Sequence, residues 1–143
     1  HRYFGLFVDM AKIKLPDVWS RLEEIGIEAK PFLYPWLQTV FLTVLPIDVV
    51  GRVWDNWILD GTSFLFRVAA SILKLFAKNL MGMEMEEAMP LLLGKYSCAH
   101  MWKEIVTEKA LFNMIARTDA PSQILAAIHE LEKKSSLLGL TSP

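Results

Sequence analysis

The stretch SFLFRVAASILKLFAK, residues 63–78, sets the fold class of this chain. Its polar residues are spaced four, four, three and four apart: Ser63, Arg67, Ser71, Lys74 and Lys78. On a helix this spacing gathers them in one thin stripe and leaves the rest of the surface apolar. We therefore expect a helix over 63–78 that is buried on nearly every side and lies at the centre of an all-α fold.

The segment ahead of this stretch predicts another helix, which starts at Pro46 and closes at Gly61. Its apolar residues form one wide face that we expect to be buried: Ile47, Val50, Val53, Trp54, Trp57 and Ile58. Thr62 or Ser63 is expected to cap the next helix by accepting a hydrogen bond from a free backbone N–H. Two helices should therefore meet at Gly61.

Three more helices are expected upstream. The first spans roughly Arg2 to Ile13. The second begins at Pro16 and stops at Gly26, a residue type that commonly ends helices in a left-handed conformation. The third is densely apolar from Phe32 to Leu45 and tolerates Pro35 only if this proline lies in its first turn.

Shorter helices are expected downstream. One follows a connector rich in Met and Glu, from Met81 to Glu87, and ends at Gly94. Another carries apolar residues at helical spacing from Met101 to Ile115, and a last helix covers Ile124 to Leu131. The array then has about seven or eight helices, and residues 135–143 are expected to fray.

The strongly apolar composition raises the question of a membrane span. Hydrophobic residues make up 53% of the 143 residues, and the mean hydropathy is +0.31. A helix that crosses a bilayer needs about 20 mostly apolar residues. Prolines and an aspartate interrupt the longest candidate, 32–50, and three basic residues interrupt the next, 64–80. We therefore expect no transmembrane segment.

Charge and cysteine content narrow the partners and the compartment. Fifteen basic and sixteen acidic residues leave a net charge of −1 without a basic stripe, so nucleic acid is not an expected partner. The single cysteine, Cys98, has no intramolecular disulfide partner, and the first residues lack a signal-peptide pattern. We expect one cytoplasmic domain.

No pattern predicts catalysis, a cofactor or a metal. The glycine and lysine spacing of a phosphate-binding loop is missing. None of the three histidines has a second His or Cys three or four residues further on. Cys98 and His100 point apart on a helix, so we assign Cys98 no role. We interpret the following glutamates as a solvated face: Glu84, Glu86, Glu87, Glu104 and Glu108.

The remaining signal is packing and recognition. Five tryptophans are a heavy load for this length, and Trp serves more often as a core or interface anchor than as a catalyst. Four methionines also cluster: Met81, Met83, Met85 and Met89. Thioether side chains adapt to varied partners, but core filling is the simpler interpretation of this cluster.

Five short elements between residues 36 and 69 carry a family resemblance. They are Trp36 to Phe41, Leu45-Pro46, Arg52 to Asp55, Asp60-Gly61 and Phe64 to Ala69. In this order they resemble the second half of a TBC domain, the fold of Rab GTPase-activating proteins, and the similarity covers about Phe4 to Leu93. The signature residues are Trp36, Phe41, Arg52, Trp54, Asp55, Gly61, Phe66 and Arg67.

The resemblance implies that catalytic residues lie outside this chain. In the family, an arginine from an Ile-x-x-Asp-x-x-Arg motif and a glutamine from a Tyr-x-Gln motif assist GTP hydrolysis, both in the N-terminal half of the domain. Neither motif occurs here. Gln38 follows Tyr34 by four residues instead of two, and Arg52 and Arg67 match structural positions.

Two interpretations follow from the resemblance. The chain is one lobe of a GTPase-activating protein, itself inactive, which helps the whole domain to bind a small Rab-type GTPase and stimulate GTP hydrolysis. Such a protein is cytoplasmic and becomes peripheral on membranes through its GTPase partner. Alternatively, the chain is a non-catalytic scaffold with an aromatic and Met-lined groove for a partner helix. A small-molecule enzyme is a third alternative, but the sequence offers no set of nucleophile, base and orienting residue.

Residue roles and boundaries complete these expectations. We expect four aromatic residues in the core: Trp36, Phe41, Trp54 and Phe66. Gly61 should make the helix turn, and Arg52 should orient Asp55. Residues 1–94 form the TBC-like C-terminal lobe, and residues 95–143 form a helical extension packed on the same domain. A lobe without its other half exposes an apolar face, which favours a homodimer.

Overall fold

The computed structural model describes residues 2–137, and every regular element in that range is helical. The N-terminal part contains α1 (Arg2–Lys14), α2 (Pro16–Glu24), α3 (Lys30–Gln38), α4 (Ile47–Asp60) and α5 (Thr62–Leu75). The remainder contains α6 (Ala77–Met81), α7 (Met85–Leu92), the 3-10 turn η1 (Tyr96–Cys98), α8 (Ala99–Ile105), α9 (Glu108–Ala116) and α10 (Ser122–Leu137). The all-α prediction is confirmed, although ten α-helices within residues 2–137 exceed the seven or eight expected.

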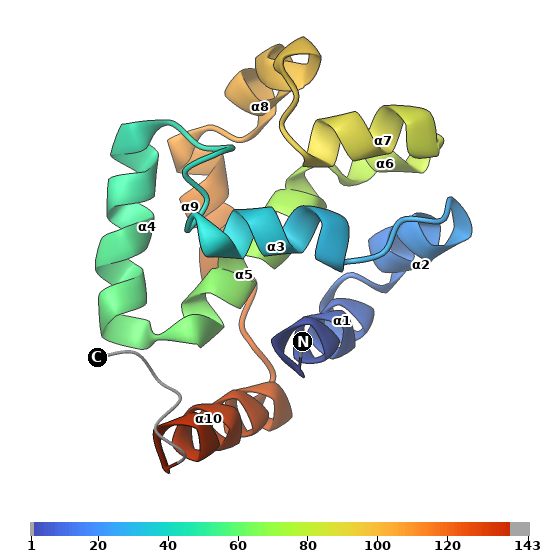
Figure 1. The fold of residues 1–143 in the computed structure, drawn as a ribbon. Helices are drawn as coiled ribbons and strands as arrows, with labels where there is room; N and C mark the ends of the chain where they lie inside the picture. The colour runs from blue at the N-terminus through green and yellow to red at the C-terminus, as the bar shows by residue number, and fades with distance from the viewer. Residues whose placement is uncertain (1, 138–143) are drawn as a thin grey trace.

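Helix α5 is the centre of the array. Figure 1 shows it behind α3, with α4 and α9 beside it and α1 and α10 below. It packs against α1, α3, α4, α6, α9 and α10. Nine of its fourteen residues, between Phe64 and Leu73, are buried, which confirms a helix buried on most sides, although Ser71 of the predicted polar stripe is buried as well. The helix ends at Leu75, however, and α6 begins after Phe76, whose ring packs edge-on against Trp102 with 4.9 Å between centroids.

The helix predicted from Met101 to Ile115 is two helices. Thr107 separates α8 from α9 with an extended backbone, and its hydroxyl accepts a hydrogen bond from the Ala110 amide at 3.2 Å. This N-cap satisfies one of the free amides at the start of α9. The fraying predicted from residue 135 is wrong for 135–137, which belong to α10, and residues 138–143 lie outside the described residues.

The third predicted helix is shorter than expected. α3 ends at Gln38, and the chain then turns through Val40 and Phe41 with φ of +49° and +66°, so a helix to Leu45 is wrong. The Phe41 amide donates to the Trp36 carbonyl at 2.7 Å, and the Phe41 side chain is fully buried. Burial of this ring therefore outweighs the helical preference of the segment. Pro35 also lies inside α3 and not in its first turn, because the helix starts at Lys30.

The glycines mark helix ends as predicted. Gly26, Gly61 and Gly94 have φ of +87°, +81° and +67°, a region that side chains with a Cβ rarely adopt. The expected cap at Thr62 or Ser63 is wrong, because Gly61 itself occupies the N-cap position of α5 without a side-chain hydrogen bond. The Thr62 hydroxyl instead donates to Glu132 on α10 at 3.2 Å. No helix in residues 2–137 combines the length and apolar character needed to cross a membrane.

Candidate interaction surface

Three signature aromatics lie in the core, as predicted. Trp36 is 1% exposed, and Phe41 and Phe66 are fully buried. The Trp36 indole N–H donates to the Leu92 carbonyl at 2.8 Å, which connects α3 to the end of α7. Its ring meets Trp102 of α8 edge-on, with centroids 5.8 Å apart and planes at 88°. These residues hold the array together and leave no group free for chemistry.

Arg67 on α5 hydrogen-bonds to backbone carbonyls at the C-terminal end of α9. Its Nη2 donates to the Ile115 carbonyl at 2.9 Å, and its Nε donates to the Thr118 carbonyl at 3.1 Å. Carbonyl groups in the last turn of a helix have no partner within the helix, so a cation there is stabilising. Both nitrogens are therefore occupied in joining α5 to α9.

Arg52 on α4 does not orient Asp55, so that expectation is wrong. Its Nη1 pairs with Glu108 Oε2 at 2.7 Å, and its guanidinium lies 3.8 Å from the centroid of the Phe112 ring. Helix α9 thus offers Arg52 both a carboxylate and an aromatic face, and Asp55 offers only a carboxylate. Within residues 2–137, the Asp55 carboxylate forms no hydrogen bond or ion pair.

Trp54 is not a core residue, which corrects the fourth aromatic prediction. Its side chain is 39% exposed, and its indole N–H donates to the Val40 carbonyl at 3.2 Å. The wide face predicted on this helix is divided in the same way. Val50 and Val53 are buried, whereas Ile47 and Ile58 are 74% and 77% exposed. The inner half of the face packs on the core, and the outer half is on the surface.

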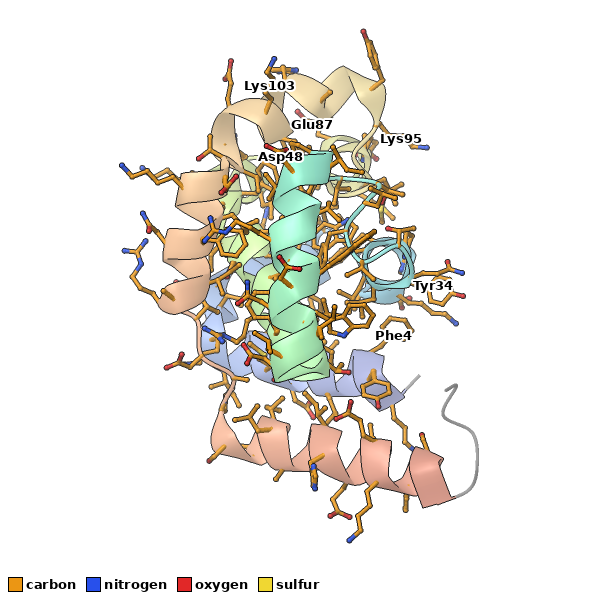
Figure 2. The ribbon with its side chains drawn as sticks, turned by 90° about the vertical axis from the view of Figure 1, so that its left-hand side faces the viewer. Phe4, Tyr34, Asp48, Glu87, Lys95 and Lys103 are labelled. Carbon is orange, nitrogen blue, oxygen red and sulfur yellow. The ribbon has the colours of Figure 1, made fainter. Side chains whose placement is uncertain are left out.

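The outer half of α4 forms one stripe, which we call the α4 stripe: Ile47, Gly51, Trp54 and Ile58. Figure 2 shows α4 in front of the molecule, with Asp48 at its upper end. At about 100° per residue, the four stripe positions fall within about 60° of one another around the helix. Ile47 and Ile58 are largely exposed, and Trp54 is 39% exposed although its indole N–H donates to the Val40 carbonyl. An exposed apolar stripe of this kind is a typical protein-binding surface.

A second apolar feature is an open pocket of about 730 Å³ between α1, α3, α5 and α10. Its apolar wall includes Phe4 and Tyr34, whose rings are 6.1 Å apart, and Figure 2 shows Tyr34 above Phe4 on this side. Tyr3 and Glu132 also line the pocket. Burial, and secondarily the Glu132 carboxylate, raises the pKa of the Tyr3 hydroxyl, which stays protonated at neutral pH. The pocket therefore presents aromatic rings together with hydroxyl, amide and charged groups, Lys30 and Glu132 among them.

One polar cluster was not anticipated from the sequence. Arg21 on α2 donates to the Met83 carbonyl at 2.6 Å and to Glu84 at 2.8 Å, and it also pairs with Glu24. Glu84 and Glu87 form a capping box at the start of α7. The reciprocal spacing of the two glutamates was the available signal. Both fit the predicted solvated face, since their side chains lie at the surface.

The eight signature residues do not converge on one site. Gly61 turns the chain, the buried aromatics pack, the two arginines connect to α9, and Trp54 and Asp55 are exposed on α4. Within residues 2–137, no group of three or more His, Cys, Asp or Glu side chains is arranged to hold a metal ion. The arrangement is suited to support and recognition.

Comparison with known proteins identifies the family. The family model for the Rab-GTPase-TBC domain matches residues 1–81, more than half of the chain. The chain belongs to this family. Its all-helical structure without strands in residues 2–137 agrees with a TBC domain, and TBC domains act as GTPase-activating regulators.

Similar proteins include one with a TBC name and one named as a Rab GTPase-activating protein. Human TBC1 domain family member 14 is 30% identical over 140 residues, which is 95% of this chain and 20% of the relative. Drainin of Dictyostelium discoideum is 33% identical over 90 residues, covering 63% of this chain and 20% of the relative. Rab GTPase-activating protein eat-17 of Caenorhabditis elegans is 26% identical over 73 residues, 51% of this chain and 8% of the relative. This TBC-family chain thus spans a fifth or less of these relatives.

Proposed function

We propose that the chain is the C-terminal lobe of a Rab GTPase-activating TBC domain. It supports GTPase binding and the stimulation of GTP hydrolysis and supplies no catalytic residue. The observation that carries this proposal is the family match over residues 1–81. Signature residues that pack in the core or connect helices also favour a structural role for this chain over a catalytic one.

The positions of the polar candidates support catalysis by residues outside this chain. An arginine that assists phosphoryl transfer must reach the developing charge on the phosphate. Arg67 is engaged by two backbone carbonyls, and Arg52 is paired with Glu108 across a helix interface. Gln38 lies in the last turn of α3 and lines the open pocket.

We also propose that residues 1–94 form the lobe and residues 95–143 an extension that folds on it as one unit. Trp102 of α8 supports this, because it packs between Trp36 and Phe76, and its indole N–H donates to the Leu91 carbonyl at 2.8 Å. α9 packs along α5. Both contacts cross the proposed boundary.

The apolar wall of the open pocket is the face on which we propose that isolated chains self-associate as a homodimer. Phe4 and Tyr34 lie there, and Tyr34 is 47% exposed. In the whole protein this face would pack on the rest of the TBC domain. Light scattering of the chain and of its Tyr34→Glu variant would test self-association, which should weaken in the variant.

We also propose that the whole protein is cytoplasmic and reaches membranes through its GTPase partner.

The deciding experiment is single-turnover GTP hydrolysis with a panel of Rab-type GTPases. It compares the 143-residue chain with the same chain extended upstream through the rest of its parent sequence. Acceleration of at least about a hundredfold by the extended form alone supports the lobe assignment, since GTPase-activating residues contribute 10³–10⁵ in rate. Acceleration by the 143-residue chain itself contradicts it.

A scaffold function is the second candidate, and the α4 stripe favours it. Ile47, Ile58 and part of Trp54 are exposed along one side of α4. If neither form accelerates hydrolysis and partner binding through α4 persists, the TBC fold here serves protein interaction alone.

A further inference from the structure

We propose that the α4 stripe is the docking site for a basic amphipathic helix of a partner protein. The inference goes beyond GTPase activation and does not depend on it. It rests on the spacing of the stripe, on Gly51, and on the charge beside the stripe.

The spacing of the stripe matches the seam between two packed helices. Ile47, Gly51, Trp54 and Ile58 are separated by four, three and four residues. A four-three repeat averages 3.5 residues and keeps one narrow face toward a partner helix over successive turns. From Ile47 to Ile58 the seam is about 16 Å long, which is three helical turns. That length suits a helix better than an extended loop or a single side chain.

Gly51 has no explanation within the described chain. It lies in the interior of α4, where glycine is less stable than alanine. A Cβ built at this position would meet nothing within 4 Å, so no neighbouring group of the fold requires its small size. On the stripe, however, the missing side chain opens a notch between Ile47 and Trp54. A notch of this kind allows the backbone of a second helix to approach closely.

The charge beside the stripe selects a basic partner. Asp48 and Asp55 share one flank of the stripe, within about 20° of each other around the helix. Both are exposed, and neither forms an ion pair within residues 2–137. Asp48 also favours the helix N-terminus, whereas Asp55 has no such role. A lysine or arginine beside the seam of the incoming helix would pair with these carboxylates.

A second copy of the chain fits this surface less well. In an antiparallel pair related by a twofold axis, the same flank of each helix lies on the same side of the interface. Asp48 and Asp55 of one copy would then face the same residues of the other, and like charges at this position repel. A parallel pair would leave all four carboxylates without partners. The charge pattern therefore favours a different chain with basic flanks.

The test measures binding of two labelled synthetic peptides by fluorescence anisotropy. Both are helices of about 20 residues with leucine at four-three spacing. One carries lysine on its flanks, and the other carries glutamate at the same positions. The lysine peptide should bind at least about tenfold more tightly at low salt, and the preference should shrink as salt screens the charges. Equal binding of the two peptides, or no binding, overturns the proposal.

Two exposed apolar residues on different helices supply matched variants. Ile58→Lys lies on the stripe and Leu125→Lys on α10; the two residues are 77% and 44% exposed, and both changes add one positive charge. Ile58→Lys should weaken binding about tenfold, whereas Leu125→Lys should change it less than about threefold. Equal effects of the two variants would indicate charge attraction to the protein as a whole and overturn the proposal. Asp55→Lys should remove the preference for the lysine peptide.

Gly51→Ala separates docking from folding. Alanine should raise the melting temperature, because it favours the helix, and should weaken peptide binding about fivefold, because its methyl group fills the notch. A gain in stability with unchanged binding contradicts the role of Gly51. Two further experiments test whether something other than a partner helix covers the α4 stripe. Loss of peptide binding in the chain extended through its TBC domain, or an Ile58-dependent dimer without peptide binding, would assign the stripe to another contact and overturn the proposal.

Discussion

Helices α4 and α5 are adjacent, have fourteen residues each, and both carry an Arg-Val pair among aromatic residues, yet they are used differently. Nine residues of α5 are buried against three of α4. Arg67 of α5 binds two backbone carbonyls, whereas Arg52 of α4 forms an exposed ion pair. The same kind of sequence is thus buried in the core on α5 and largely exposed on α4.

Among substitutions that test this difference between α4 and α5, Phe66→Ala on α5 should have the largest effect on the free energy of unfolding. Phe66 is fully buried and packs edge-on against Phe7, with centroids 5.6 Å apart. The change should lower the free energy of unfolding by about 3–5 kcal/mol, since the ring leaves a cavity. Urea denaturation measures this loss. A loss below about 1 kcal/mol would show that α5 is not the centre of the core.

The next largest effect is expected for Arg67→Met. The substitution keeps most of the aliphatic packing and leaves the Ile115 and Thr118 carbonyls without their charged donor. The expected loss in unfolding free energy is about 2 kcal/mol. Arg52→Met is the matched control on α4, where an exposed ion pair should contribute below about 1 kcal/mol. Equal losses would remove the distinction between the two arginines.

Trp54→Ala should cost about 1.5 kcal/mol, less than Phe66→Ala, because Trp54 is 39% exposed and the change removes a partly buried ring and its hydrogen bond to Val40. Thermal and urea unfolding would measure it beside Phe66→Ala. A loss of 3 kcal/mol or more would return Trp54 to the core and undo the division of α4 into an inner and an outer half.

The smallest expected effect is an increase in the free energy of unfolding, from a substitution of Lys74 on α5. Burial, and secondarily the charges of Lys14 and Arg117, lowers the pKa of Lys74 in the folded chain. The unfolded chain then holds this proton more tightly, so the folded state is penalised at neutral pH, and the penalty fades as pH rises toward about 10.5. Lys74→Met should therefore stabilise the chain by about 0.5 kcal/mol at pH 7, with a smaller gain at high pH. Lys78→Met, on the exposed side of α6, is the control and should not stabilise.

Much of the fold follows from local rules that operate within one or two helical turns. The polar stripe of residues 63–78 predicted a buried helix, and Gly26, Gly61 and Gly94 predicted helix ends, because periodicity and backbone preference are local. The resemblance in the signature residues also led to the correct family. None of these inferences required knowledge of what lies on the other side of a helix.

The wrong predictions concern residues whose exposure or partner depends on contacts between segments far apart in the sequence. The apolar face of α4 looks the same in sequence whether it packs on the core or awaits a partner, so the exposure of Trp54 and Ile58 was not predictable. Arg52 lies 56 residues from Glu108, and its nearer neighbour Asp55 was the obvious but wrong partner. The surface of this chain is therefore less predictable than its core.

The turn after α3 has a consequence for the order of folding. Val40 and Phe41 hold left-handed backbone conformations that cost roughly 1–2 kcal/mol each for residues with a Cβ. In the separate peptide nothing offsets that cost, so residues 36–45 would remain a continuous helix or a coil. The turn forms only once Trp36 and Phe41 are enclosed by the other helices. We therefore expect the turn to form late in folding, so that its contacts influence the rate of unfolding more than the rate of folding.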